Sequence, residues 1–263
     1  MAINCWNALD IFSQLFRRDL QSRHRGAVLG FGAMLVNQLV MLALYVLVFG
    51  FVFRGRYGII PDESGLDYAL GLFVALTFFN YTAECLTRAP GLILERPNYV
   101  KKVVFPLELI PLSANCATLA QLLLSTVPLL LVFASATRHL SWAILWLVAL
   151  LVPLFLFNLG ILWLGSALGV FVRDFQLLIG PVNQVLMFGS AVFYSLKNLP
   201  APFGAILQWN PFARLFQMAR EAVLAGRTPD LMVLTVICVA SLLFCWGAYT
   251  SFHHLKAAFA DVL

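Results

Sequence analysis

The sequence predicts an all-α integral membrane protein, and three observations lead to this fold class. Of the 263 residues, 62% are hydrophobic and only 11% are charged, with a mean hydropathy of +0.90. Soluble domains carry about 25% charged and about 45–50% apolar residues. The charges cluster between uncharged stretches that are too long and uniform for barrel strands, which alternate over about ten residues. The solvent for most of this chain is therefore lipid.

Six apolar stretches are long enough to cross a bilayer, for which a helix needs about 20 residues. Glu84, near the end of the second stretch, is the only formal charge within them. We therefore predict one transmembrane domain over residues 1–263, with six helices. The predicted spans are 27–53, 68–87, 109–134, 142–168, 177–195 and 231–252.

Lysine and arginine residues predict the orientation, because cytoplasmic loops are enriched in them. With six spans both termini lie on one side, and that side carries ten such residues against three in the two short loops opposite. The remaining four lie in the long 196–230 segment, where the rule is weaker. Both termini are predicted to be cytoplasmic, with the chain in a bacterial inner membrane.

Two segments on the predicted cytoplasmic side combine apolar and charged residues in patterns that predict a specific role. Residues 1–26 contain an apolar stripe at helical spacing, which predicts an amphipathic helix in the membrane interface; the alternative is a solvated tail. Residues 88–106 form a loop longer than most helix connections, which run about 2–8 residues. Its mixture of apolar and charged residues predicts a docking surface for a soluble partner; the alternative is a basic interfacial anchor.

The 196–230 segment is predicted to form two short re-entrant helices on the periplasmic side. Asn210 is a good N-cap, Pro211 suits the first helical position, and Gly226 suits the position after the end. One apolar stripe runs between them, and a second apolar stretch over 199–209 is broken by prolines. Because neither is long enough to span, we expect both to dip into the outer leaflet.

The sequence offers no catalytic machinery. No glycine precedes a lysine, so the phosphate-binding P-loop is absent, and neither an HExxH helix nor a GxSxG turn occurs. The predicted spans contain Glu84 and several amides, which more often join helices than catalyse reactions. Ion-coupled transporters usually bury several acidic residues. Any energy for transport is therefore expected from another subunit.

Four segments in order resemble the ABC-2 family of exporter permeases, in its polysaccharide and O-antigen branch. They are FRRDLQSRHRGAVLGFGAMLVNQL at the start, ERPNYVKKVVFPLELIPL after the second span, FVRDF before the fifth, and WNPFARLFQMAREAVLAG before the last. The resemblance extends over nearly the whole chain with matching spacing. Each motif alone is weak, whereas four in sequence are specific to the family but not to the substrate.

The resemblance implies a homodimeric permease with no cofactor of its own, working with a separate ABC ATP-binding subunit that holds ATP and Mg²⁺. The cargo would be a polysaccharide linked to undecaprenyl pyrophosphate, exported for lipopolysaccharide biosynthesis. It also implies three groups of site residues: an ATPase contact (Arg17, Arg18, Arg173 and Asp174), a coupling loop (Arg88, Glu95, Arg96, Lys101 and Lys102) and a periplasmic gate (Asn210, Pro211, Arg214 and Arg220).

Two further hypotheses concern the cargo. The basic residues of the coupling loop could attract a pyrophosphate head, although they also satisfy the positive-inside rule. Aromatic rings could carry a glycan through the first two spans, since sugars stack on rings, although aromatic girdles are common at membrane interfaces. The rings in question are Tyr45, Phe49, Phe73, Phe78, Phe79 and Tyr81.

Other functions remain open. Within transport, the alternatives are a permease for capsule glycan, teichoic acid or drugs. A membrane-embedded acyl- or glycosyltransferase belongs to another class, and it would need a buried histidine or paired carboxylates that this sequence does not offer. A structural scaffold would leave the predicted outer helices without a role.

Overall fold

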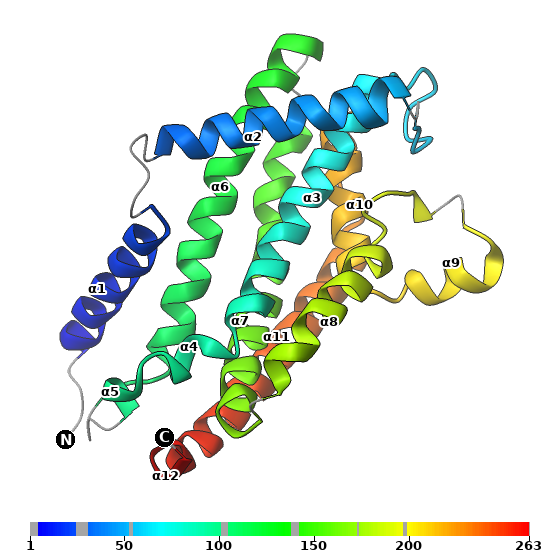
Figure 1. Ribbon diagram of the computed structural model, residues 1–263. Coiled ribbons are helices and arrows are strands. Elements are labelled where there is room, and N and C mark those ends of the chain that lie inside the picture. Colours follow the sequence, from blue (N-terminus) through cyan, green and yellow to red (C-terminus); the bar gives the residue numbers. More distant parts are fainter. Residues whose placement is uncertain are drawn as a thin grey trace.

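The computed structural model describes residues 5–24, 31–52, 55–100, 105–137, 142–172, 174–196 and 199–262. Within these ranges every regular element is a helix, which confirms the all-α class (Figure 1). The longer helices are α1 (Cys5–His24), α2 (Phe31–Tyr45), α3 (Gly65–Arg88), α6 (Leu109–Thr137), α7 (Trp146–Phe171), α8 (Phe175–Gly189), α10 (Pro211–Leu224) and α11 (Leu231–Leu255). The short ones are the π-helix η1 (Val46–Val52), the 3₁₀ turns η2 (Trp142–Leu145) and η4 (Lys256–Ala258), α4 (Gly91–Leu94), α5 (Pro97–Val100), α9 (Ala201–Leu207) and α12 (Phe259–Val262).

Four helices in the described part of the chain are long and apolar enough to cross a membrane. They cover Gly65–Arg88, Leu109–Pro128, Trp142–Phe171 and Leu231–Ala258, and so correspond to the second, third, fourth and sixth predicted spans. The first and fifth predicted spans correspond to shorter apolar helices, Val36–Val52 and Phe175–Gly189. In Figure 1, α2 crosses the bundle at a steep angle instead of running alongside α3 and α6.

Helix α3 forms the centre of the bundle. It begins with a capping box, in which Ser64 accepts a hydrogen bond from the backbone of Asp67 and the Asp67 carboxylate accepts one from the backbone of Ser64. Its side chains are buried almost continuously from Tyr68 to Phe79. It packs against α6, α7 and α10, so the core surrounds this one helix.

Helices α7 and α11 form the most extensive helix pair of the fold. A Cβ atom at Gly160 of α7 would lie 2.6 Å from the Phe244 ring of α11, so the missing side chain permits the close approach. Near the other end of α7, a Cβ at Gly169 would collide with the backbone of Pro90, which follows α3. Small residues commonly allow such close contacts between membrane helices, where dispersion replaces the hydrophobic effect.

The predicted N-terminal helix is present as α1, which packs beside α6 and buries Leu15. In Figure 1, α1 and α12, which lie near the two ends of the chain, are at the same end of the bundle as α4 and α5.

The two short helices predicted within 196–230 are also present, as α9 and α10. Asn210 caps α10 by accepting a hydrogen bond from the Phe212 backbone, Pro211 is its first residue, and Gly226 after its end has a φ of 60°. The expected apolar stripe of α10 is buried against α3 and α7, with Leu215 and Phe216 both 0% exposed. Its apolar face is therefore satisfied within the chain, whereas α9 exposes Phe203 and Ile206.

Candidate functional site

The guanidinium of Arg220 joins α10 to the turn that follows α8. Arg220 lies on α10 and is 1% exposed. Its Nη1 donates hydrogen bonds to the carbonyl oxygens of Ala191 (2.8 Å) and Val192 (3.0 Å), in the turn that follows α8. Ala191 has a φ of +52°, an unusual conformation for a residue with a side chain. A planar cation with several donors suits this task, because it can bind successive carbonyls of one turn.

Two tyrosines also donate hydrogen bonds to carbonyls of this turn. Tyr57 precedes α3 and donates to the Val192 carbonyl (2.9 Å), while Tyr68 on α3 donates to the Phe193 carbonyl (2.8 Å). The two rings stack at 4.4 Å, and the Arg220 guanidinium lies 4.4 Å from the Tyr57 ring centroid. We call Tyr57, Tyr68, Arg220 and the turn 190–194 the outer clamp.

The loop that carries Tyr57 is fixed by a buried carboxylate. Glu63 is 3% exposed and accepts hydrogen bonds from the backbone N–H groups of Tyr57 (2.8 Å) and Gly58 (2.7 Å). Gly58 has a φ of 69°, which glycine adopts without strain. The clamp therefore rests on a loop that is itself held rigidly.

The predicted gate residues have different environments. The Asn210 amide donates to the carbonyl of Gly189 (2.8 Å), and so reaches the same turn as Arg220. Arg214 instead donates from Nε to the Gln208 carbonyl (3.1 Å) beside α9, outside the outer clamp. The structure thus brings Asn210 and Arg220 to one turn and leaves Arg214 apart from them.

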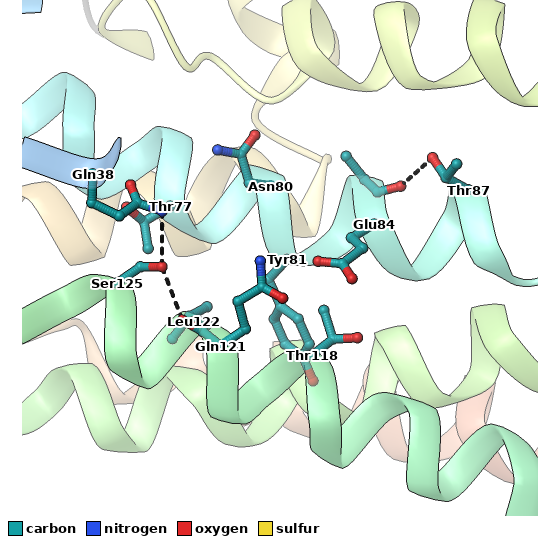
Figure 2. Close-up of a pocket in the computed structure, with 11 residues that line it drawn as sticks. Gln38, Thr77, Asn80, Tyr81, Glu84, Thr87, Thr118, Gln121, Leu122 and Ser125 are labelled. Atoms are coloured by element: carbon teal, nitrogen blue, oxygen red, sulfur yellow. Dashed lines mark hydrogen bonds between the residues drawn. The ribbon is translucent and has the colours of Figure 1, made fainter. Parts of the chain in front are cut away.

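A polar cleft of about 400 Å³ lies between α3 and α6 (Figure 2). Its polar residues repeat at helical spacing on each wall. The lining residues are Gln38 from α2; Thr77, Asn80, Tyr81, Ala83, Glu84 and Thr87 from α3; and Thr118, Gln121, Leu122 and Ser125 from α6.

The cleft is closed at one end by a hydrogen bond between helices. The Gln38 amide of α2 donates to the hydroxyl of Ser125 on α6 (3.0 Å). Near the other end, Asn183 of α8 donates to the hydroxyl of Thr87 (3.0 Å). An amide in hydrocarbon without a partner costs several kcal/mol, on the order of 4–8 kcal/mol in a solvent that offers no hydrogen bonds. The hydrogen bonds of Gln38 and Asn183 therefore satisfy amides that would be costly to bury alone, and they join α2 and α8 to the walls of the cleft.

The aromatic residues predicted to form a passage occupy three environments. Tyr81 borders the cleft, with its hydroxyl directed to the Asn115 side chain (2.6 Å) behind the wall. Phe73, Phe78 and Phe79 are buried in the core, at no more than 6% exposure.

Tyr45 and Phe49 pack near the outer clamp, where Phe49 lies 6.4 Å from the Tyr68 ring. A passage lined by all of these rings would require the bundle to open.

The coupling loop is joined to α1 by a buried ion pair. Arg96, which lies between α4 and α5, donates from Nη2 to the carboxylate of Asp19, and Asp19 is 2% exposed. Ser113 of α6 donates to the other Asp19 oxygen (3.2 Å). A second contact is made by Arg18, whose Nη1 donates to the Tyr99 hydroxyl (3.2 Å). We call Asp19, Arg96 and Ser113 the inner junction.

The end of α11 is attached to the start of α6 through Glu108. The carboxylate of Glu108 accepts a hydrogen bond from Lys256 and lies 3.1 Å from the ring nitrogen Nδ1 of His253. Burial raises the pKa of the Glu108 carboxyl. The hydrogen bond from Lys256 and the lysine charge lower the pKa by more than burial raises it, so the net pKa is below the ordinary value. Glu108 is therefore ionised at neutral pH.

The other predicted contact residues lie on the same end of the fold or outside the described residues. Arg17 is exposed on α1, Arg88 is in the last turn of α3, Glu95 is exposed after α4, and Asp174 is exposed before α8. Lys101, Lys102 and Arg173 lie outside the described residues.

The sequence indicates many of the polar residues of these sites, but it does not indicate which side chains they contact. Asp19 lies within the N-terminal motif, and Glu84 and the amides are visible in the sequence as polar groups within spans, but nothing local indicates which of them meet. Tyr57 and Glu63 carried no recognisable signal. A search for polar residues at i, i+3 and i+7 on a predicted span would have found the walls of the cleft.

The described residues form a helical bundle in which four helices are long and apolar enough to cross a membrane. The chain belongs to the ABC-2 type transporter family, whose pattern matches residues 11–224. This confirms the family indicated by the four segments.

Among named relatives, the chain is similar to the O-antigen export system permease protein RfbA of Klebsiella pneumoniae, at 24% identity over 267 residues, covering 100% of this chain and 98% of the relative. It is 27% identical over 251 residues to the protein of the same name from Myxococcus xanthus, covering 94% and 93% of the two chains. The polysialic acid transport protein KpsM of Escherichia coli is 22% identical over 232 residues, with 87% and 86% covered.

Proposed function

We propose that this chain is the permease subunit of an ATP-driven exporter that moves a lipid-linked polysaccharide, such as O-antigen, across the bacterial inner membrane. The observation that carries the proposal is the end-to-end match to O-antigen export permeases, which covers 100% of this chain and 98% of the first relative. A match over the full length preserves the order of the spans and the segments between them. Undecaprenyl pyrophosphate is the lipid carrier we propose.

A separate ABC subunit would supply the energy, with ATP and Mg²⁺ bound there. Two features support this division of labour. The chain has no P-loop. The inner junction also gathers α1, the coupling loop and α6 at one end of the bundle, where a push on the loop would be transmitted to α6 through Asp19 and Ser113.

We further propose six spans with both termini in the cytoplasm, and a channel between two copies of the chain. The location of α1 and α12 at one end of the bundle supports two termini on the same side of the membrane, and the distribution of lysine and arginine supports the cytoplasmic side. For α2 and α8 to join the four long helices as spans, α2 would have to tilt from its steep crossing towards the bundle axis. Reporter fusions at the two termini would test the orientation, and opposite faces would refute it.

The export proposal is tested by deleting this chain from a cell that makes the glycan. We expect lipid-linked glycan to accumulate on the cytoplasmic side and surface glycan to disappear, and a plasmid copy to restore it. An ABC ATPase should co-purify with the tagged protein in mild detergent. Normal surface glycan in the deletion strain would overturn the proposal.

Capsule export is the second candidate, and the similarity to a polysialic acid transport protein favours it. The deletion strain separates the two candidates. Loss of lipopolysaccharide side chains supports the first, and loss of capsule with intact side chains supports the second.

A further inference from the structure

We propose that the groove between α10 and α11 binds one anionic phospholipid of the adjoining membrane leaflet, with Arg214 on the lipid phosphate and an acyl chain along Val236 of α11. In the orientation proposed above, this is the outer leaflet. The inference goes beyond the proposed function, because it concerns a resident lipid of the membrane and does not depend on the cargo.

The groove has a volume of about 490 Å³ and lies between two helices that rest on a third. Helices α10 and α11 both pack against α7. Asn210, which caps α10, donates to the Gly189 carbonyl beside the outer clamp, so the start of α10 lies at the clamp end of the bundle. The main wall residues are Trp209, Pro211 and Arg214 on one side, and Met232, Val236 and Ala240 on the other.

The α11 wall is an apolar surface that stays within one leaflet. Met232, Val236 and Ala240 are spaced four residues apart, so they lie on one face of the helix. At about 1.5 Å per residue this wall is about 12 Å long, whereas half of the hydrocarbon core is about 15 Å thick. Met232 is 78% exposed and Val236 is 62% exposed, so the described part of the chain leaves this wall uncovered.

The polar mouth of the groove has to select the lipid, because any acyl chain can cover an apolar wall. It carries a single charged side chain, Arg214. Arg214 is half-buried, and its Nε donates to the Gln208 carbonyl (3.1 Å), which orients the guanidinium plane. Among the described residues no carboxylate forms an ion pair with Arg214, and its two Nη groups donate to no protein acceptor.

A lipid phosphate matches these unused donors. A guanidinium presents its N–H groups as a planar fork, which binds two oxygens of one phosphate. Trp209 at the same mouth is 88% exposed, and membrane proteins commonly place tryptophan at the depth of the lipid headgroups. Asp230, at the start of α11, accepts hydrogen bonds from the backbone of Met232 and Val233 and does not line the groove. The mouth is therefore cationic.

Two other occupants match the groove less well. The proposed carrier of the cargo ends in a pyrophosphate, whose two phosphates carry more negative charge than one guanidinium neutralises. A second copy of the chain would offer apolar faces such as that of α8, where Leu177 and Val185 are exposed, and these bring no anion to Arg214. Phosphatidylglycerol combines one charged phosphate with acyl chains, and so matches both the mouth and the wall.

The bound lipid would connect α10 to α11 at the clamp end of the bundle. Because α10 carries both Arg214 and Arg220, a lipid held by Arg214 also supports the helix on which the outer clamp depends. A ligand that binds only the folded protein raises its stability. Lipid binding and thermal stability should therefore change together.

The first experiment measures lipid retention by native mass spectrometry of the full chain, released from mild detergent that contains phosphatidylglycerol. We expect one phosphatidylglycerol to stay bound per chain. Arg214→Gln should weaken retention about tenfold or more, the effect of losing a charged hydrogen bond, and Arg214→Lys should be intermediate. Arg227→Gln, an exposed arginine between α10 and α11 but outside the groove, is the matched control and should retain the lipid.

The same measurement tests the choice of an anionic headgroup. Phosphatidylcholine has the same phosphate but no net charge. We expect it to be retained about fivefold less, the effect of one basic side chain on an anionic lipid. Equal retention of the two lipids by the wild type would overturn the proposal, as would equal retention of phosphatidylglycerol by the wild type and Arg214→Gln.

The apolar wall is tested by filling it. Val236→Trp places an indole in the groove and should lower phosphatidylglycerol retention about tenfold. Val239→Trp is the matched control, because Val239 is on the same helix outside the groove and has a similar exposure, 57% against 62%. Undiminished retention by Val236→Trp would overturn the proposal. Charge and volume thus test the site separately, in variants that are monodisperse in detergent.

The second experiment measures the thermal midpoint as phosphatidylglycerol is added to the purified protein. The lipid should raise the midpoint of the wild type and of Arg227→Gln by several degrees, and that of Arg214→Gln by less than half as much. An equal rise in all three proteins would contradict a role for Arg214 in binding.

Two results would assign the groove to another occupant and overturn the proposal. One is displacement of phosphatidylglycerol by an equal concentration of undecaprenyl pyrophosphate, which would identify the carrier of the cargo as the ligand. The other is efficient crosslinking of Val236→Cys between two copies, in a variant whose five native cysteines are replaced. That result would place a second copy over the groove.

The lipid site and the proposed function can fail separately. If deletion of the chain leaves surface glycan unchanged while the purified protein retains phosphatidylglycerol through Arg214, the export proposal alone fails. If deletion abolishes surface glycan while Arg214→Gln retains phosphatidylglycerol as the wild type does, the lipid proposal alone fails.

Discussion

Asp19 in the N-terminal helix α1 and Arg96 in the loop after α3 form a buried ion pair across 77 positions of sequence. The pair is completed by Ser113 at the start of α6, so three separate segments share one carboxylate. Because Arg96 already has an anionic partner, its charge serves the junction first and is less available to a pyrophosphate head. The rigid link from α1 through Asp19 to α6 is a physical route for coupling.

Removing either partner of the inner junction should destabilise the fold. We expect Asp19→Ala to cost about 3–5 kcal/mol, because it leaves the Arg96 charge buried without its counter-ion. The measurement is the thermal midpoint of the purified protein in detergent. The double variant Asp19→Leu with Arg96→Met should recover much of the loss, since an apolar pair leaves no unpaired charge.

If the double variant is destabilised by as much as the two single variants added together, the two residues do not interact. Arg17→Met, an exposed arginine on the same helix, is the matched control and should change the midpoint little.

The outer clamp predicts that Arg220 contributes far more to stability than Arg214. Arg220→Met removes charged hydrogen bonds to two carbonyls, each worth about 1.5–3 kcal/mol, and should lower the thermal midpoint by several degrees. Arg220→Lys should be intermediate, because a lysine retains the charge without the planar fork. Arg214→Met, which loses one bond at a half-buried site, is the comparison. Similar midpoints for both methionine variants would contradict the clamp.

Glu108 predicts a stability difference that depends on pH. Its pKa is lower in the folded protein, so the contribution is complete above the ordinary value of 4.5 and is lost as the pH falls through the folded value. We expect Glu108→Gln to be less stable than wild type near neutral pH, and the difference to shrink below pH 4.5. Thermal midpoints of both proteins across this range test the prediction. A difference that is constant with pH would exclude the carboxylate as its source.

The contact between α7 and the end of α3 predicts that Gly169 cannot be enlarged. Gly169→Ala would force a methyl group into the backbone of Pro90, and overpacking of this kind costs about 1–3 kcal/mol. Gly180→Ala on α8 has open space around the new Cβ and should be neutral or slightly stabilising, because alanine favours a helix by up to about 1 kcal/mol. Chemical or thermal unfolding in detergent compares the two, and equal effects would contradict the close packing.

The sequence by itself determined the properties that depend on neighbouring residues. Apolar runs located the four long helices, helical spacing located α1, and Asn210, Pro211 and Gly226 located the ends of α10, because length, periodicity and capping are local. The ordered motifs also indicated the family correctly.

Only the tertiary structure decided which side chains meet. Arg220 appeared as one residue of a gate motif, but its carbonyl partners lie nearly thirty positions away. The rings of α3 looked suited to a passage, yet the packing of α6, α7 and α10 around α3 buries Phe73, Phe78 and Phe79. The polar cleft likewise exists because two helical faces, separated in sequence, are turned towards each other. Hydropathy measures how strongly a residue avoids water. The helix that its side chain faces within a bundle depends on tertiary contacts, which no local sequence pattern specifies.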